Sequence, residues 1–200
     1  IRVTEAAEGA LDVGIDATEH PVASDQRRDQ AGALVHLGCA VGTVAQAEFD
    51  HTPLGGQWCF YTGANASGSA NSGDVDGGKT TLVTPPINCT GFAEAEVSFW
   101  LWYSNNRGGP SSVDDAMAVD ISGNGAAATP TWVRAITLMN EAPIAQTTAQ
   151  WRKHTVRVGQ FVGLTSQVRL RFVARDTGSG STVEAAVDDF AVVGLTCAPV

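Results

Sequence analysis

The chain has 200 residues, of which 44% are apolar and 16% are charged, with a formal net charge of −9 and a pI near 4.7. This acidity excludes nucleic acid and anionic membranes as expected partners, because binding to phosphates needs a basic surface. No stretch approaches the run of about 18 apolar residues that a membrane-spanning helix needs, and the 22 glycines favour short strands joined by turns over long helices.

The first 46 residues differ from the remainder of the chain. The acidic, alanine-rich stretches there favour one or two strands or an extended arm, and the charged cluster at 25–29 is typical of a solvated turn. We predict an N-terminal arm or linker over residues 1–46, followed by one folded domain over residues 47–197. Because the sequence begins at Ile1, without an initiating Met or a signal peptide, we expect it to be a processed or excised part of a larger secreted protein.

Alternating apolar and polar residues then predict about nine strands with polar connections. The interleaved helices of a parallel α/β fold are missing, so we predict an all-β, two-sheet antiparallel β-sandwich. A glycine-rich stretch at 63–79 is predicted to be a long surface loop and a candidate site, and 104–112 a turn-rich loop. The predicted strands lie at 43–50, 56–62, 80–86, 95–103, 116–122, 131–138 and 151–158, with two more in 166–195 around a turn at 176–181.

The predicted strand at 95–103 is apolar on both faces, as expected for a central strand. One face consists of Val97, Phe99, Leu101 and Tyr103, and the other of Trp100 and Trp102. Tryptophans within strands belong to the core more often than to a sugar-binding platform.

Four widely spaced cysteines form no C-x-x-C pair, which argues against a zinc site and favours disulfides in an oxidising compartment. Sequence alone leaves the connectivity open; the pairing that we favour joins Cys39 to Cys197 and Cys59 to Cys89. The alternative is four buried free thiols in a cytosolic protein.

Three acidic pairs stand out in the sequence: Asp74 with Asp76, Asp114 with Asp115, and Asp188 with Asp189. Calcium binds carboxylates and backbone carbonyls, but a short Asp-x-Asp-Gly is equally compatible with a solvated loop. Asp188 and Asp189 are more informative, because consecutive strand residues face opposite sides and a buried carboxylate needs compensation. A metal or a firm hydrogen-bond network is therefore expected there, unless a β-bulge turns both side chains outward.

Catalytic motifs are lacking in the sequence. There is no nucleophile elbow, P-loop or zinc-protease pair, the four histidines are scattered, and no carboxylate pair is set beside an aromatic platform. We therefore predict no enzyme activity. The best polar candidates for ligand contact follow the central strand: Tyr103, Asn105, Asn106 and Arg107.

An ordered set of motifs resembles the jelly-roll accessory domain of secreted bacterial proteins. The motifs are LVTPPIN at 82–88, AEVSFWLWYSNN at 95–106, DDAMAVDIS at 114–122, the stretch 151–158, SQVRLRFVARD at 166–176 and VEAAVDDF at 183–190. The sequence is similar to the C-terminal module of immune inhibitor A-type metallopeptidases and, more distantly, to MAM domains.

This resemblance covers about residues 47–195 and implies a fold, a function and a metal site. It implies a concanavalin-like or galactose-binding-like sandwich, a non-catalytic adhesion role and a structural Ca²⁺. The positions of this sequence that it implies as metal ligands are Asp74, Asp76, Asp188 and Asp189.

Three functions remain open at this point. The first is a calcium-stabilised extracellular or cell-surface module that binds a protein or glycan partner. The second is a structural subunit of a surface layer, sheath or filament that self-assembles through residues 1–46. The third is a carbohydrate-binding module that uses exposed aromatic residues.

Overall fold

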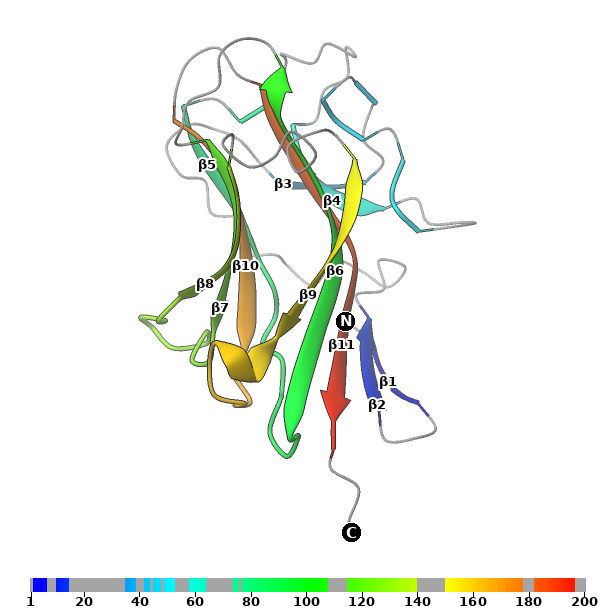
Figure 1. Ribbon diagram of the computed structural model, residues 1–200, viewed down its shortest axis with the longest axis vertical. Helices are drawn as coiled ribbons and strands as arrows, with labels where there is room; N and C mark the ends of the chain where they lie inside the picture. Colours follow the sequence, from blue (N-terminus) through cyan, green and yellow to red (C-terminus); the bar gives the residue numbers. More distant parts are fainter. Residues whose placement is uncertain are drawn as a thin grey trace.

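Two antiparallel β-sheets face each other and enclose the core (Figure 1). The computed structural model describes residues 2–6, 10–14, 35–38, 42–43, 45–47, 49–52, 58–63, 74–75, 77–107, 115–139, 150–177 and 182–196. The smaller sheet has the strand order β5 (Gly78–Val83), β10 (Arg169–Asp176), β7 (Ala116–Ser122), β8 (Val133–Met139). The predicted two-sheet sandwich is confirmed.

The larger sheet is organised around β11 (Thr182–Leu195). One edge of β11 pairs with β6 (Glu94–Arg107), which in turn pairs with β9 (Trp151–Arg157). The other edge is shared: β4 (Cys59–Thr62) pairs with the first half of β11 and β2 (Ala10–Gly14) with the second half. Outside these lie β3 (Val35–Gly38) beside β4 and β1 (Arg2–Ala6) beside β2.

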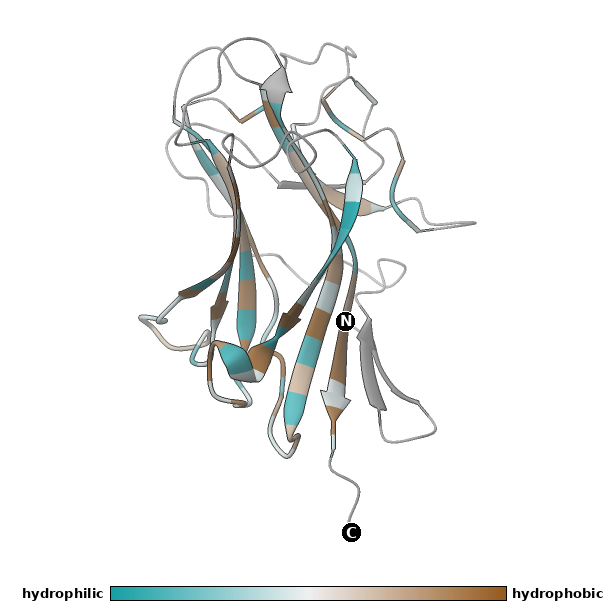
Figure 2. Ribbon diagram, viewed as in Figure 1, coloured by the Kyte–Doolittle hydropathy of each residue, from teal (hydrophilic) through white to brown (hydrophobic). Residues whose placement is uncertain are grey.

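The core fills the space between the two sheets with the inward-facing residues of each strand. Figure 2 shows the resulting alternation of hydrophilic and hydrophobic residues along β6 and β10. At the centre the Phe99 ring meets Phe172 edge-on at 4.9 Å between centroids and stacks on Phe190 at 6.4 Å. Truncation of one such buried ring to alanine typically lowers the free energy of unfolding by about 3–5 kcal/mol. The contact between these rings therefore contributes strongly to the packing of the two sheets.

The predicted strands agree with the structure at most positions, and 116–122 agrees at both ends. Two predictions are wrong. The central strand continues through residue 107, where a loop was predicted from residue 104. Residues described within 43–50 form bends instead of a strand, since the Thr43 hydroxyl accepts the amides of Ala45 and Gln46 and turns the chain.

Residues 1–46 contribute strands as well as connections. The described parts include β1, β2 and β3, of which β2 and β3 pair with strands of the larger sheet. The division into an arm at 1–46 and a domain at 47–197 stays a prediction. Within the described residues, the helical structure is a short 3₁₀ turn at Val158–Gln160, and no helix is long and apolar enough to cross a membrane.

The predicted bridge between Cys59 and Cys89 is wrong. Cys89 is a buried free thiol in the core between the sheets, where burial and the nearby Glu94 carboxylate raise its pKa to about 11. Cys59 belongs to a separate apolar cluster, with Tyr61 and Ala186. Cys89 lies in the connection between β5 and β6, so the two thiols belong to different clusters of buried residues. Cys39 and Cys197 lie outside the described residues.

Candidate functional site

The Asp188–Asp189 pair lies at a β-bulge in β11. The register with β6 shifts between Asp188 and Ala191, and Asp189 adopts a φ of +46°. Aspartate tolerates this left-handed conformation better than most residues. The extra residue turns both carboxylates away from the core, which is the arrangement that the sequence left open as the alternative to a buried charge.

Both carboxylates accept hydrogen bonds from the segment that contains His51 and Thr52. Asp188 accepts the His51 amide at 2.7 Å and the Asp189 amide at 2.8 Å. Asp189 contacts the His51 Nδ1 at 2.7 Å and accepts the Thr52 hydroxyl at 2.7 Å. We call these four residues the aspartate clasp. Burial raises the pKa of Asp188, and its two backbone hydrogen bonds act in the opposite direction.

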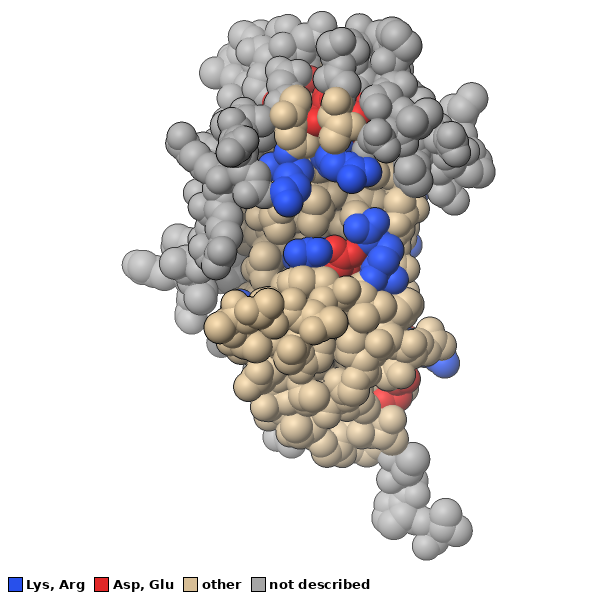
Figure 3. Space-filling view, turned by 90° about the vertical axis from the view of Figure 1, so that its left-hand side faces the viewer, with Lys and Arg blue, Asp and Glu red and all other residues tan. Residues whose placement is uncertain are grey.

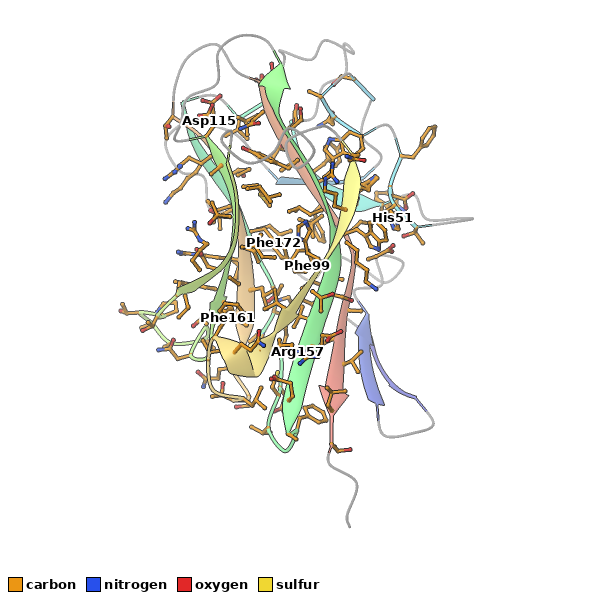
Figure 4. All side chains as sticks on the ribbon, viewed as in Figure 1. His51, Phe99, Asp115, Arg157, Phe161 and Phe172 are labelled. Atoms are coloured by element: carbon orange, nitrogen blue, oxygen red, sulfur yellow. The ribbon has the colours of Figure 1, made fainter. Side chains whose placement is uncertain are left out.

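The aspartate clasp and two tryptophans hold the described residues of segment 43–52 against the outer face of the larger sheet. The His51 ring stacks on Trp100 with 3.5 Å between centroids, on the outer side of the sheet in Figure 4. The Trp102 indole donates to the Ala45 carbonyl at 2.8 Å, and the Trp151 indole to the Phe49 carbonyl at 3.2 Å. Trp102 and Trp151 therefore use their indole N–H groups within the protein, and the His51 ring covers one face of Trp100.

A buried carboxylate lies beneath the same segment. Glu184 is 2% exposed and accepts the Thr62 hydroxyl at 2.5 Å and the Gln46 side-chain amide at 3.4 Å. Burial, with a smaller contribution from the Asp74 charge, raises the pKa of Glu184 to about 8 against the lowering effect of Thr62. Burial of Glu184 therefore favours its protonated form over the carboxylate, a property that its sequence position gave no reason to expect.

The four predicted metal ligands do not come together in the described residues. Asp74 precedes Val75, which forms an isolated bridge with Val183. Val183 lies five residues before Asp188 on β11, a distance of about 17 Å along the strand, so Asp74 is far from the Asp188–Asp189 pair. Asp76 lies outside the described residues. All four oxygens of the Asp188–Asp189 pair already accept or contact protein groups, and no group of three or more His, Cys, Asp or Glu that could hold a metal occurs in the described part of the chain. The arrangement does not fit the predicted calcium site.

The predicted ligand contacts after the central strand are also placed differently. Tyr103 is 2% exposed and Asn105 is fully buried, since β6 continues through both residues as a strand of the larger sheet. Burial, followed by the Asp115 charge, raises the pKa of the Tyr103 phenol above its ordinary value. Asp115 itself is buried at the upper end of the sandwich and accepts the Thr177 amide at 3.1 Å (Figure 4). The side chains of Asn106 and Arg107 lie outside the described structure.

The outer face of the smaller sheet carries a cationic surface on this acidic protein. In Figure 3, Lys and Arg gather on the upper half of this face, around one central acidic group and below further acidic atoms at the upper end. The strand registers place Lys79, Arg134, Arg171 and Arg175 here around the Asp120 carboxylate, and Arg169 lies on the same side of β10. We call this surface the arginine face; it consists of Lys79, Asp120, Arg134, Arg171 and Arg175.

At the centre of the arginine face, one buried carboxylate orients two guanidinium groups. The Asp120 side chain is 3% exposed; its Oδ1 accepts the Arg134 Nε–H and its Oδ2 the Arg171 Nε–H at 2.8 Å. The guanidinium carbon of Arg171 lies 4.5 Å from the centre of the Trp132 ring, a cation–π contact. The alternation of arginines in β10 was visible in the sequence, but their convergence with Arg134 depends on strand pairing that no local pattern specifies.

No protein-family model matches the chain, and no curated protein matches it. Among solved structures, the chain is similar to the K1 cleaved adhesin domain of Lys-gingipain from Porphyromonas gingivalis W83, with a TM-score of 0.46 and 15% identity over 94% of this chain and 91% of that domain. It is also similar to a carbohydrate-binding module of the β-sandwich superfamily, with a TM-score of 0.49 and 12% identity over 91% of this chain and 56% of that one. These similarities concern the fold alone. The narrower resemblance to MAM domains and immune inhibitor A modules stays a prediction.

Proposed function

We propose that the chain is a non-catalytic binding module of a secreted or cell-surface protein, and that the arginine face contacts its partner. The observation that carries this proposal is the pair of guanidinium groups held by Asp120. The side chain of Arg134 is 51% exposed and that of Arg171 is 34% exposed, so both groups reach solvent. Charged groups that are fixed and solvent-accessible are suited to recognising a ligand of opposite charge.

The two outer faces of the sandwich differ in a way that supports this assignment. On the larger sheet, the described part of segment 43–52 is hydrogen-bonded to Trp102, Trp151 and the aspartate clasp. On the smaller sheet, the described outer positions carry side chains that project directly from the strands. The smaller sheet therefore offers the more accessible surface for a partner.

The carboxylates that would be natural candidates for acid–base chemistry have structural partners instead. Asp188 and Asp189 fasten the segment that crosses the larger sheet, and Asp120 orients two arginines. General acid–base catalysis requires a carboxyl group that can reach a substrate proton. The contacts of these three residues favour binding over catalysis.

The proposal is tested by arraying neutral and acidic glycans together with extracellular proteins and measuring binding of the full chain to each. We expect saturable binding to at least one ligand class, with the bound ligand recovered unchanged. Product release from any bound polymer would contradict the non-catalytic assignment. Absence of binding across both panels would contradict the module's proposed role.

A further inference from the structure

The geometry at Asp120 leaves part of each guanidinium group available to a ligand. Both arginines use their Nε–H toward Asp120, and Arg134 also donates from Nη1 to the Thr137 hydroxyl at 3.1 Å. The terminal nitrogens of Arg171 have no hydrogen bond to the described residues. A guanidinium carries five N–H donors in a fixed fork, so terminal donors of both groups can still bind an anion.

On this basis, and resting on the proposed binding function, we propose that the arginine face binds a carboxylated polysaccharide, with Arg134 and Arg171 holding a uronate group. A planar carboxylate matches the planar guanidinium fork. The Asp120 carboxylate accepts one Nε–H from each guanidinium group on the protein side. A ligand carboxylate on the solvent side would accept the terminal N–H donors.

The two arginines are oriented before any ligand arrives. Asp120 is almost fully buried, and Arg171 is further held over the Trp132 ring. Side chains fixed in this way lose little conformational entropy on binding. Replacement of either arginine therefore removes N–H donors that are already oriented toward a ligand.

A second cationic row lies farther along the same face. Arg171 and Arg175 are both on β10 and are four residues apart, which is about 14 Å along the strand. Lys79 on β5 lies directly opposite Arg175. The row between them is uncharged, with Ala118, Val173 and Thr81 at matching positions. A linear ligand along β10 would meet charged, neutral and charged zones in succession.

A nucleic acid is a less suitable ligand for this face than a polysaccharide. Binding of a phosphate backbone needs a broadly basic surface, whereas the net charge of this protein is −9. Protein partners usually insert aromatic or arginine anchors into pockets. The centre of this face is instead made of the small Ala118 and of Val173, and a guanidinium covers the Trp132 ring.

Isothermal titration calorimetry on the full chain tests the ligand class. The probes are polygalacturonate, the same polymer with its carboxyls methyl-esterified, dextran sulfate and poly-glutamate. We expect polygalacturonate to bind and its methyl ester not to bind. The affinity should fall as salt rises, with a slope of about −1 to −3 in logarithmic units for the few charges involved.

Variants then locate the site. Arg171→Gln and Arg134→Gln should each weaken polygalacturonate binding by about tenfold or more, the usual effect of losing a hydrogen bond to a charged group. Arg134→Lys keeps the charge beside Asp120 but loses the fork, and should also weaken binding. The matched control is Arg157→Gln on β9 of the other sheet, a 59% exposed arginine whose loss should change affinity by less than about twofold. Melting curves confirm that each variant is folded.

Several results would overturn the proposal. These are equal binding of the methyl ester, unchanged binding by both arginine variants, preference for dextran sulfate or poly-glutamate over polygalacturonate, or no binding of any of the four probes. The comparison of polygalacturonate with its ester uses the unmodified protein and so stands even if a variant fails to fold. If the array experiment finds a neutral glycan or a protein ligand instead, the uronate proposal fails while the binding function stands.

Discussion

Glu184→Gln should change the pH dependence of stability in a direction fixed by the structure. Glu184 is buried between Thr62 and Gln46, and its pKa is raised from 4.5 to about 8. Between these two pH values the unfolded chain releases the proton while the folded protein keeps it. Because the folded state then binds more protons, its free energy of unfolding falls as pH rises.

The magnitude follows from the linkage relation. One proton bound differentially lowers the free energy of unfolding by about 1.4 kcal/mol per pH unit. From about pH 5 to pH 8, the contribution of Glu184 therefore falls by about 4 kcal/mol. Glutamine cannot ionise, so the free energy of unfolding of Glu184→Gln minus that of the wild type should increase by about this amount over the same range.

Urea denaturation of both proteins at several pH values between about 5 and 8 measures this difference. Asp188 also has a raised pKa, but it is present in both proteins and its effect cancels in the subtraction. Glu96→Gln is the matched control, because the Glu96 side chain is 38% exposed and lies beside Arg157. Parallel stability curves for wild type and Glu184→Gln would refute the reasoning.

Three further predictions concern stability and reactivity. Asp189→Asn should lower the free energy of unfolding by about 1–3 kcal/mol, and by the same amount in calcium and in EDTA, because the Asp189 oxygens already bind His51 and Thr52. A rise in melting temperature with calcium that the wild type shows and the variant lacks would contradict this. Cys89 should resist iodoacetamide in the native protein and react in urea, since it is buried with a pKa of about 11; rapid native labelling found by peptide mass mapping would contradict its placement. Gly194→Ala should cost about 1–3 kcal/mol in denaturant unfolding, since the new Cβ would lie 2.4 Å from the Phe92 ring; an unchanged midpoint would mean that the ring moves freely.

Most of the fold could be predicted because it depends on local patterns. Strict alternation in β10 and the two apolar faces of β6 identify a strand without reference to the rest of the chain. The predictions fail where a polar residue has a tertiary role. Asn105 resembles a loop residue yet lies buried in β6, and Thr43 turns its segment through a local hydrogen bond to Ala45.

Less of the candidate site than of the fold could be predicted from the sequence. The sequence identified Asp188 and Asp189 as a pair needing compensation, and the hydrogen-bond network around them provides it. Its donors, His51 and Thr52, lie more than a hundred residues earlier, so no local pattern links them to the pair. Asp120 and Arg134 likewise meet only through the pairing of β7 with β8.

The position of β11 at the centre of the larger sheet has a consequence for the order of folding. β11 is the last strand in chain order, yet β2, β4 and β6 all hydrogen-bond to it, and Val193 pairs with Asp12 near the other end of the chain. During synthesis, these earlier strands must wait for residues 182–195 before the larger sheet can close. Such long-range pairing slows folding and leaves strand edges exposed meanwhile. The domain therefore depends on residues 182–195 to leave an aggregation-prone state.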